Sequence, residues 1–103
     1  MGKYMVVYTG LPGQDEDPAE VRAAWERWFQ ELGAAVTDPG DVFTAGRTVA
    51  TDGSSSDGTR TKLTGYTMLE ADDLDAAVAM AAKCPGLANA AIEVYASVPL
   101  DSL

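Results

Sequence analysis

Apolar and polar residues recur with two different periods along the chain, and the changes of period divide it into six elements. Period two, with β-branched and aromatic residues, predicts strands, and apolar residues three or four positions apart predict helices. In chain order we expect a strand, a helix, two strands, a helix and a strand. The expected strands are Lys3–Thr9, Arg47–Thr51, Leu63–Glu70 and Ala91–Val98.

The first helix has the clearest predicted boundaries. Asp17 can cap it, Pro18 suits its first position, and Gly33 ends it in the usual way. Its apolar stripe consists of Val21, Ala24, Trp25, Trp28, Phe29 and Leu32. We expect both tryptophans to be core residues, because their spacing matches the rest of the stripe.

A second, alanine-rich helix is expected to begin at Asp72 or Asp73, either of which can cap it. The apolar stripe predicted for it consists of Leu74, Ala77, Val78 and Ala81. Residues 34–46 form a connection whose turn is Asp38–Gly40, and the polar residues 52–60 are expected to form the least ordered loop.

The order strand, helix, strand, strand, helix, strand is that of a single α+β domain over residues 1–103. It predicts a ferredoxin-like βαββαβ fold, with a four-stranded antiparallel sheet and both helices on one face. Both faces of the first strand carry apolar residues, so both should be covered. We expect a second copy of the chain to cover the face without helices, which gives a homodimer with sheet against sheet.

Such a face could hold a ligand pocket lined by aromatic rings with polar ends and by a few charges. The candidate ligand-binding residues are Tyr8, Arg47, Tyr66, Glu70, Glu93 and Tyr95. In the alternative interpretation, the tyrosines pack in the interface between copies and the charges lie at solvated strand edges.

The charge balance argues against two classes of partner. The 103 residues contain 16 acids and 7 bases, for a net charge of −9, and the bases are scattered. Nucleic acid and anionic membrane surfaces are therefore not expected partners, and the acidity is explained by solubility. The sequence has no apolar run of about 20 residues and no signal-peptide pattern. With one cysteine, Cys84, it fits the cytoplasm.

The residue types also argue against metals and cofactors. A chain with no histidine and one cysteine cannot build a typical zinc site. Residues 52–60 lack the acid spacing of a calcium loop. The glycine-rich stretches lack the dinucleotide and P-loop patterns. Cys84 sits at a helix end, which disfavours a thiolate, so a structural role is expected.

Several stretches together resemble the YCII-related domain family of small bacterial ferredoxin-like proteins. They are "KYMVVYTG", "WERWFQELGAAV", "FTAG", "LTGYTMLEADDLDAAVAMAAKCPGL" and "AIEVY", which cover most of the chain. The resemblance implies a dimeric α/β barrel. Some members of that family are considered enzymes that use a His–Asp pair, and many have no known activity. A subgroup with an Asp-Gly-Pro-Phe motif includes members linked to sigma factors.

This chain departs from the family in two places. It has no histidine, so a His-based acid or base is excluded. Asp57 and Gly58 are followed by Thr59, so the Asp-Gly-Pro-Phe motif is incomplete. The aspartate of the pair maps near Asp52, the one catalytic candidate, which can equally be a solvated turn residue.

Three functions stay open at this stage. The first, which the missing histidine favours, is a dimeric small-molecule-binding or regulatory domain without chemistry of its own. The second is a cofactor-free enzyme of isomerase or lyase type that transfers protons with a carboxylate (Asp52, Glu70 or Glu93) and a tyrosine. The third is a protein-interaction module linked to transcription regulation, which rests on the family resemblance alone.

Overall fold

The computed structural model describes residues 1–11 and 16–103. The α-helices, strands and short 3-10 helices (η) of this part of the chain are β1 (Gly2–Tyr8), α1 (Pro18–Leu32), η1 (Gly33–Ala35), β2 (Val36–Asp38), β3 (Arg47–Val49), β4 (Ser55–Asp57), β5 (Gly65–Ala71), α2 (Leu74–Ala81), η2 (Pro85–Ala88), β6 (Ile92–Ser97) and η3 (Leu100–Ser102).

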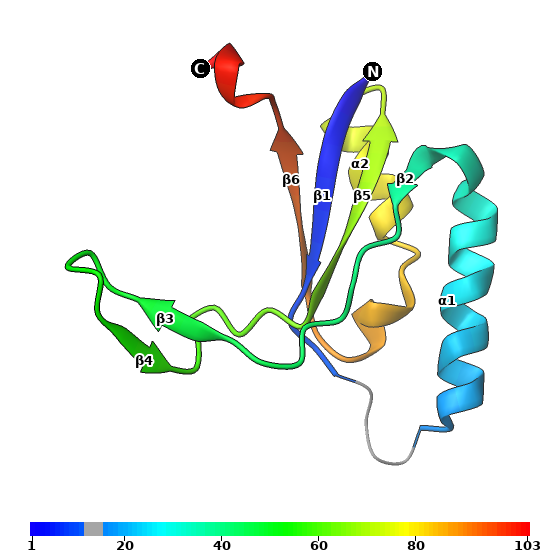
Figure 1. Ribbon diagram of the computed structural model, residues 1–103. Coiled ribbons are helices and arrows are strands. Elements are labelled where there is room, and N and C mark those ends of the chain that lie inside the picture. The colour runs from blue at the N-terminus through cyan, green and yellow to red at the C-terminus, as the bar shows by residue number, and fades with distance from the viewer. Residues whose placement is uncertain (12–15) are drawn as a thin grey trace.

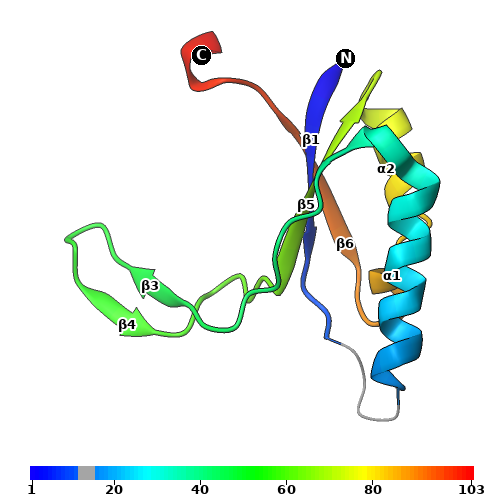
Figure 2. The ribbon, with the colours of Figure 1, turned by 45° about the vertical axis from the view of Figure 1, so that its right-hand side comes forward.

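The main sheet has four antiparallel strands in the order β2-β5-β1-β6. Both helices lie on one face of it, and the other face is uncovered (Figures 1 and 2). This is the strand order and layering of a ferredoxin-like domain, so the predicted α+β fold is confirmed. The two crossovers through α1 and α2 place both helices on the same side, as right-handed connections require.

Alternation along the two central strands decides which side chains the helices cover. Every second residue of β5 is buried under the helices, and the residues between them are half-buried on the other face. The buried sets are Gly65, Thr67, Leu69 and Ala71 from β5, and Tyr4, Val6 and Tyr8 from β1. Val6 and Leu69 have no exposed surface. Burying a side chain of this size contributes roughly 1.5–3 kcal/mol to the free energy of unfolding.

The termini of α1 follow the predicted signals. The Asp17 carboxylate accepts a hydrogen bond from the Ala19 N–H at 3.0 Å, and Gly33 ends the helix at φ +56°. Trp28 is 2% exposed, and its indole Nε1 donates to the Met80 carbonyl at 3.0 Å. This hydrogen bond joins α1 to the last turn of α2.

The second strand of the main sheet lies earlier in the sequence than predicted. It is β2, which pairs with β5, whereas the predicted strand at Arg47–Thr51 supplies β3. A shift of register between Val36 and Asp38 interrupts the pairing of β2 with β5. With this shift, β2 does not show the period-two pattern of apolar residues by which strands are predicted. The alternation "RTVAT" therefore drew the prediction to the wrong segment.

The arm, defined here as residues 43–63, also differs from the prediction. Its strands β3 and β4 form a separate two-stranded sheet, so residues 52–60 are not simply a loop. The Asp52 carboxylate closes the hairpin turn by accepting hydrogen bonds from the Ser54 N–H at 2.9 Å and the Ser54 hydroxyl at 2.6 Å. A polar side chain that satisfies the backbone of its own turn is a common turn device.

The apolar stripe of α2 is narrower than predicted. Ala77 and Ala81 are buried against the sheet, but Leu74 and Val78 are 46% and 47% exposed. The predicted stripe was therefore half wrong, because the small alanines, and not the larger residues beside them, face the strands. The small side chains of these alanines let α2 lie close to the sheet. Asp73 is the cap, and its carboxylate accepts from the Ala76 N–H at 2.8 Å.

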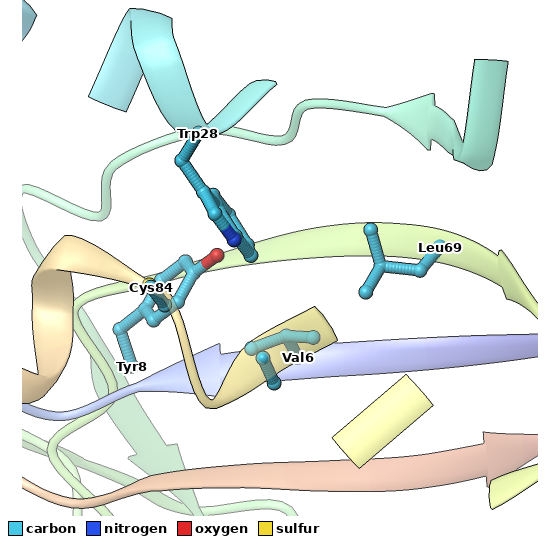
Figure 3. Packing of buried hydrophobic residues seen from close by; sticks show 6 residues of the cluster. Val6, Tyr8, Trp28, Leu69 and Cys84 are labelled. Carbon is cyan, nitrogen blue, oxygen red and sulfur yellow. The ribbon is translucent and has the colours of Figure 1, made fainter. Parts of the chain in front are cut away.

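Two linked hydrogen bonds, one buried and one partly buried, lead from the core to the turn after β2. The Tyr8 hydroxyl donates to the Thr67 hydroxyl oxygen at 2.6 Å, and Thr67 donates in turn to the Pro39 carbonyl at 2.9 Å. Figure 3 shows the Tyr8 hydroxyl pointing away from β1 toward Trp28, with Cys84 beside the ring. These two hydrogen bonds therefore hold the Asp38–Gly40 turn against β1 and β5.

Burial raises the pKa of Tyr8 well above its ordinary value of 10.0, against the opposing effect of its hydrogen bond to Thr67. Burial also raises the pKa of the Cys84 thiol, whose sulfur accepts from the Gly86 N–H at 3.3 Å. Both groups are thus neutral at physiological pH. The predicted structural role of Cys84 is consistent with its burial at 4% exposure.

Replacing Thr67 by valine should cost more than replacing Tyr8 by phenylalanine, although both lose the same hydrogen bond. Thr67→Val leaves the buried Tyr8 hydroxyl and the partly exposed Pro39 carbonyl without their partner, and the unpaired buried hydroxyl alone should cost roughly 1–3 kcal/mol. Tyr8→Phe leaves Thr67 bonded to Pro39 and should cost about 0.5–1.5 kcal/mol. The double variant should be more stable than Thr67→Val alone, as measured by urea unfolding. Strictly additive losses would show that the two side chains are not coupled.

The free energy of unfolding should fall above pH 10 in a way that depends on Tyr8. There the unfolded chain loses the Tyr8 proton while the folded protein keeps it, because the pKa of Tyr8 is raised by folding. This contribution is fully present below pH 10 and declines with a slope of up to about 1.4 kcal/mol per pH unit. Urea unfolding at pH 8 to 11 should give a shallower decline for Tyr8→Phe. Parallel curves for the two proteins would contradict the prediction.

Candidate functional site

A cavity of about 430 Å³ opens where β1 ends and β5 begins. The helix α1 forms one wall, the loop after β2 forms a second, and the strand ends form the floor. Its lining residues are Tyr8, Gly10, Leu11, Val21, Trp25, Phe29, Pro39, Gly40, Asp41, Val42, Thr64, Gly65, Tyr66, Thr67, Gly86 and Asn89. A larger hollow of about 630 Å³ lies within the arm, and among the described residues its lining consists of arm residues and Thr64.

Aromatic rings make up the α1 side of the cavity. The ring of Trp25 meets the ring of Tyr8 edge-on, with centroids 5.1 Å apart and planes at 81°. Trp25 also contacts Trp28 at 5.7 Å and Phe29 at 6.0 Å. Residues three and four positions apart lie on one face of a helix, so the sequence "WERWF" brings these rings together. Trp28 is a core residue as predicted, whereas Trp25 is half-buried and lines the cavity.

The opposite wall is set by a glycine that cannot be replaced without moving the backbone. Gly40 has φ +81°, and a Cβ at this position would lie 1.7 Å from the Tyr66 carbonyl oxygen. The turn is also held by the Asp38 carboxylate, which accepts from the Gly40 N–H at 2.9 Å. The loop therefore lies directly against β5, and the cavity keeps a fixed width there.

Tyr66 and two aspartates form the polar rim of the cavity. The Tyr66 hydroxyl donates to the second carboxylate oxygen of Asp38 at 3.0 Å, and this hydrogen bond raises the pKa of Tyr66. The ring of Tyr66 stacks on Phe43 with centroids 6.0 Å apart. Asp38 is half-buried, whereas Asp41 is exposed at the mouth. The rim thus offers a protonated phenol beside carboxylates.

The six predicted ligand-binding residues do not come together. Tyr8 was predicted to share a face with Tyr66 and Tyr95, and this was wrong. Alternation places Tyr8 on the helix face with Val6, and the register pairs place Tyr66 and Tyr95 on the uncovered face. Glu70 and Glu93 also lie on the uncovered face, opposite Lys3 and Val7 of β1. Tyr8 and Tyr66 nevertheless meet at the cavity, because it opens at the end of the sheet.

The remaining predicted residues lie on the arm. The Arg47 guanidinium pairs with the Asp57 carboxylate at 3.2 Å, and both side chains are largely exposed. Asp52 lies in the hairpin turn, and its hydrogen bonds to Ser54 lower its pKa. It is fully exposed and lies in none of the cavities described above. An ionised turn aspartate is therefore what the structure provides at this position.

Sequence reasoning missed residues that build the cavity, above all Trp25, Gly40 and Thr67. Two signals for them were present. One was the run of aromatic residues in "WERWF", and the other was the Asp-Pro-Gly turn, whose glycine can adopt positive φ. Thr67 carries no such signal, because its hydroxyl partners come from segments 28 and 59 residues away.

Two further observations concern metals and membranes. Within residues 1–11 and 16–103, no three carboxylate or thiol side chains gather closely enough to hold a metal ion. Neither described helix has the length and apolar character needed to cross a membrane.

The comparisons with known proteins agree with this fold. The structure is similar to that of 5-chloro-2-hydroxyhydroquinone dehydrochlorinase from Burkholderia phenoliruptrix, solved in complex with 2,5-dihydroxybenzoquinone. The likeness has a TM-score of 0.61 at 17% sequence identity and covers 97% of each chain, and at this identity it shows the fold alone. No curated protein sequence matches the chain. The YCII-related domain matches residues 2–101, and the chain therefore belongs to the YCII-related domain family.

Proposed function

We propose that this protein binds a small, planar and largely apolar molecule in the cavity between α1 and the ends of β1 and β5. The observation that carries the proposal is the aromatic wall formed by Tyr8, Trp25 and Phe29. A volume of about 430 Å³ falls within the range of small-molecule sites, which are mostly apolar with a few polar groups. Tyr66, Asp41 and Asn89 supply polar groups around it.

The charges around the cavity narrow the class of ligand. Among the lining residues that the structure describes, Asp41 is the charged one, and none is a lysine or an arginine. A neighbouring hollow at the start of α1 is lined by Glu16, Asp17 and Glu20 and shares Trp25 with the cavity. We therefore propose a neutral or cationic ligand, because an anion would meet like charge, whereas a cation would meet carboxylates and aromatic faces.

The structural neighbour supports the size of the proposed ligand. That dehydrochlorinase was solved with 2,5-dihydroxybenzoquinone bound, so the shared fold can hold a single-ring compound. We take the size of the proposed ligand from this neighbour. We take its proposed charge from the residues that line the cavity of this chain.

Three probes with the same ring and different charges test this proposal by isothermal titration calorimetry at pH 7. They are 1-naphthylmethylamine, 1-naphthalenemethanol and 1-naphthoate, which are cationic, neutral and anionic. We expect the amine to bind most tightly and the naphthoate most weakly. Asp41→Asn should weaken the amine by up to about fivefold, since exposed charge pairs contribute about 0.2–1 kcal/mol. Asp75→Asn, on the exposed first turn of α2, is the control and should change nothing.

A blocking variant shows whether binding occurs in this cavity. Val21→Trp would fill the space next to Trp25 and should abolish binding of all three probes. Val78→Trp places the same ring on the exposed side of α2 and should leave binding intact. Equal binding by both variants, or tighter binding of naphthoate than of the amine, would overturn the proposal.

A second candidate function, cofactor-free proton transfer, is favoured by the hydrogen bond between Tyr66 and Asp38 at the rim. The raised pKa of Tyr66 keeps its hydroxyl protonated, so it can donate to a substrate carbonyl oxygen in place of Asp38. Asp41, at the same mouth, would accept the proton released from the neighbouring carbon. This pairing of a phenol donor with a carboxylate base would suit an isomerase or lyase.

Exchange of the α-hydrogens of 2-tetralone in D₂O, followed by NMR, tests this second function. If Asp41 acts as the general base, the protein should accelerate this exchange roughly 10²–10⁴-fold over buffer. Tyr66→Phe should remove most of it. Tyr95→Phe is the matched control, because its hydroxyl also donates to a carboxylate at 3.0 Å, that of Glu93, but lies away from the cavity. Exchange no faster than in buffer, or equal effects of the two variants, would exclude this function for this ketone class.

A further inference from the structure

The hydroxyl groups that line the cavity already donate their hydrogens within the protein. Among the described residues they belong to Tyr8, Thr64, Tyr66 and Thr67. Their acceptors, in the same order, are the Thr67 hydroxyl at 2.6 Å, the Gly10 carbonyl at 2.9 Å, the Asp38 carboxylate at 3.0 Å and the Pro39 carbonyl at 2.9 Å. A hydroxyl has a single hydrogen to donate. While these bonds are kept, the four hydroxyls offer a ligand only their lone pairs.

Backbone N–H groups around the cavity are engaged in the same way. The Thr64 N–H donates to the last carbonyl of β1 at 2.7 Å. The Gly40 N–H donates to the Asp38 carboxylate at 2.9 Å, and the Gly86 N–H donates to the Cys84 sulfur at 3.3 Å. The close approach of these segments, which closes the cavity, therefore also uses up N–H donors of its wall.

Two polar side chains of the lining have no hydrogen bond to the described part of the chain. They are the Asp41 carboxylate and the Asn89 amide, and both are exposed. Asn89 lies beside the end of β1, because a Cβ on Gly10 would be 2.8 Å from the Asn89 Cβ. Asp41 lies beside the start of β5, because a Cβ on Gly65 would be 2.8 Å from the Asp41 carbonyl oxygen. These strand ends are paired, so both side chains stand at the same mouth.

The polar groups of the cavity thus offer many lone pairs and few hydrogens. The Asp41 carboxylate only accepts, and the Asn89 amide has both an accepting oxygen and a donating NH₂ group. A ligand that presented only acceptors would give up hydrogen bonds to water and find few donors to replace them. A ligand with N–H donors at its outer end would find acceptors at the mouth.

We propose that the cavity selects an aromatic compound with a primary ammonium group, whose N–H donors are accepted by Asp41 and by the Asn89 side-chain oxygen. The ring lies against Trp25 and Phe29, so this inference rests on the proposed function. Hydrogen bonds to a charged donor, and not charge alone, then decide the affinity. A quaternary ammonium of the same charge has no N–H and is disfavoured. This distinguishes the site from an aromatic cage, which binds quaternary ammonium through ring faces.

Two pairs of probes test the selection by isothermal titration calorimetry at pH 7. The first pair is 1-naphthylmethylamine and its N,N,N-trimethyl derivative, which have the same ring and charge but differ in N–H donors. We expect the amine to bind roughly tenfold more tightly or better. The second pair is 1-naphthalenemethanol and its methyl ether, which removes one donor at zero charge and adds only one methyl group. The alcohol should bind more tightly than the ether.

A variant of Asn89 tests which residue makes the selection. Asn89→Leu removes the amide and keeps the backbone N–H that donates to the Gly86 carbonyl at 3.1 Å. It should weaken the amine roughly three- to tenfold and leave the trimethyl derivative unchanged. Gln30→Leu removes an amide from the exposed side of α1, outside the lining, and is the matched control. Equal effects of the two leucine variants would exclude Asn89 as a specificity-determining residue.

The outcomes separate this inference from the proposed function. If the amine and its trimethyl derivative bind equally and Val21→Trp still abolishes both, selection by donors is wrong and the cavity remains the binding site. Tighter binding of the trimethyl derivative would likewise overturn the inference and indicate an aromatic cage. If no naphthyl probe binds, the proposed function fails and this inference fails with it.

Discussion

The packing of the helices on one face of the two central strands, β1 and β5, is the contact on which the rest of the structure depends. On the helix face the strands present Val6 and Leu69, which have no exposed surface, and small residues at Gly65 and Ala71. The small residues let α2 approach through Ala77 and Ala81. On the other face Val7 is 5% exposed although no helix covers it. The helices thus cover one of the two faces of β1 that carry apolar residues.

The cavity arises where this close packing stops. Beyond the end of β1 the floor is made of glycine and threonine, while the wall from α1 is made of large aromatic rings. Small residues opposite large rings leave a space, and the hydrogen-bonded chain from Tyr8 through Thr67 to Pro39 prevents the turn from closing over it. The same contacts that stabilise the core therefore shape the candidate site. A buried polar chain of this kind is stabilising only when every member is satisfied, as it is here.

Much of the fold could be predicted from the sequence, because its signals are local. The caps of α1, the Asp-Pro-Gly turn and the order of elements each depend on neighbouring residues. The errors came where distant contacts decide. β2 has a shift of register that hides its pairing with β5, and Leu74 and Val78 are exposed because the sheet selects the alanines of α2. The site was harder still. Tyr8 and Tyr66 could be proposed from residue type, but both line the same cavity only because it opens at the end of the sheet.

The two tryptophans also give the protein an optical property of its own. Trp25 and Trp28 are 5.7 Å apart between ring centroids, with planes at 81°, and one is half-buried while the other is 2% exposed. Indoles this close exchange excitation energy, so their electronic transitions mix and depend on the angle between the rings. The deeper ring is held by its bond to the Met80 carbonyl, and the outer ring faces the cavity. A rotation of the outer ring would therefore alter the coupled spectrum of both, which makes the wall of the cavity an intrinsic chromophore.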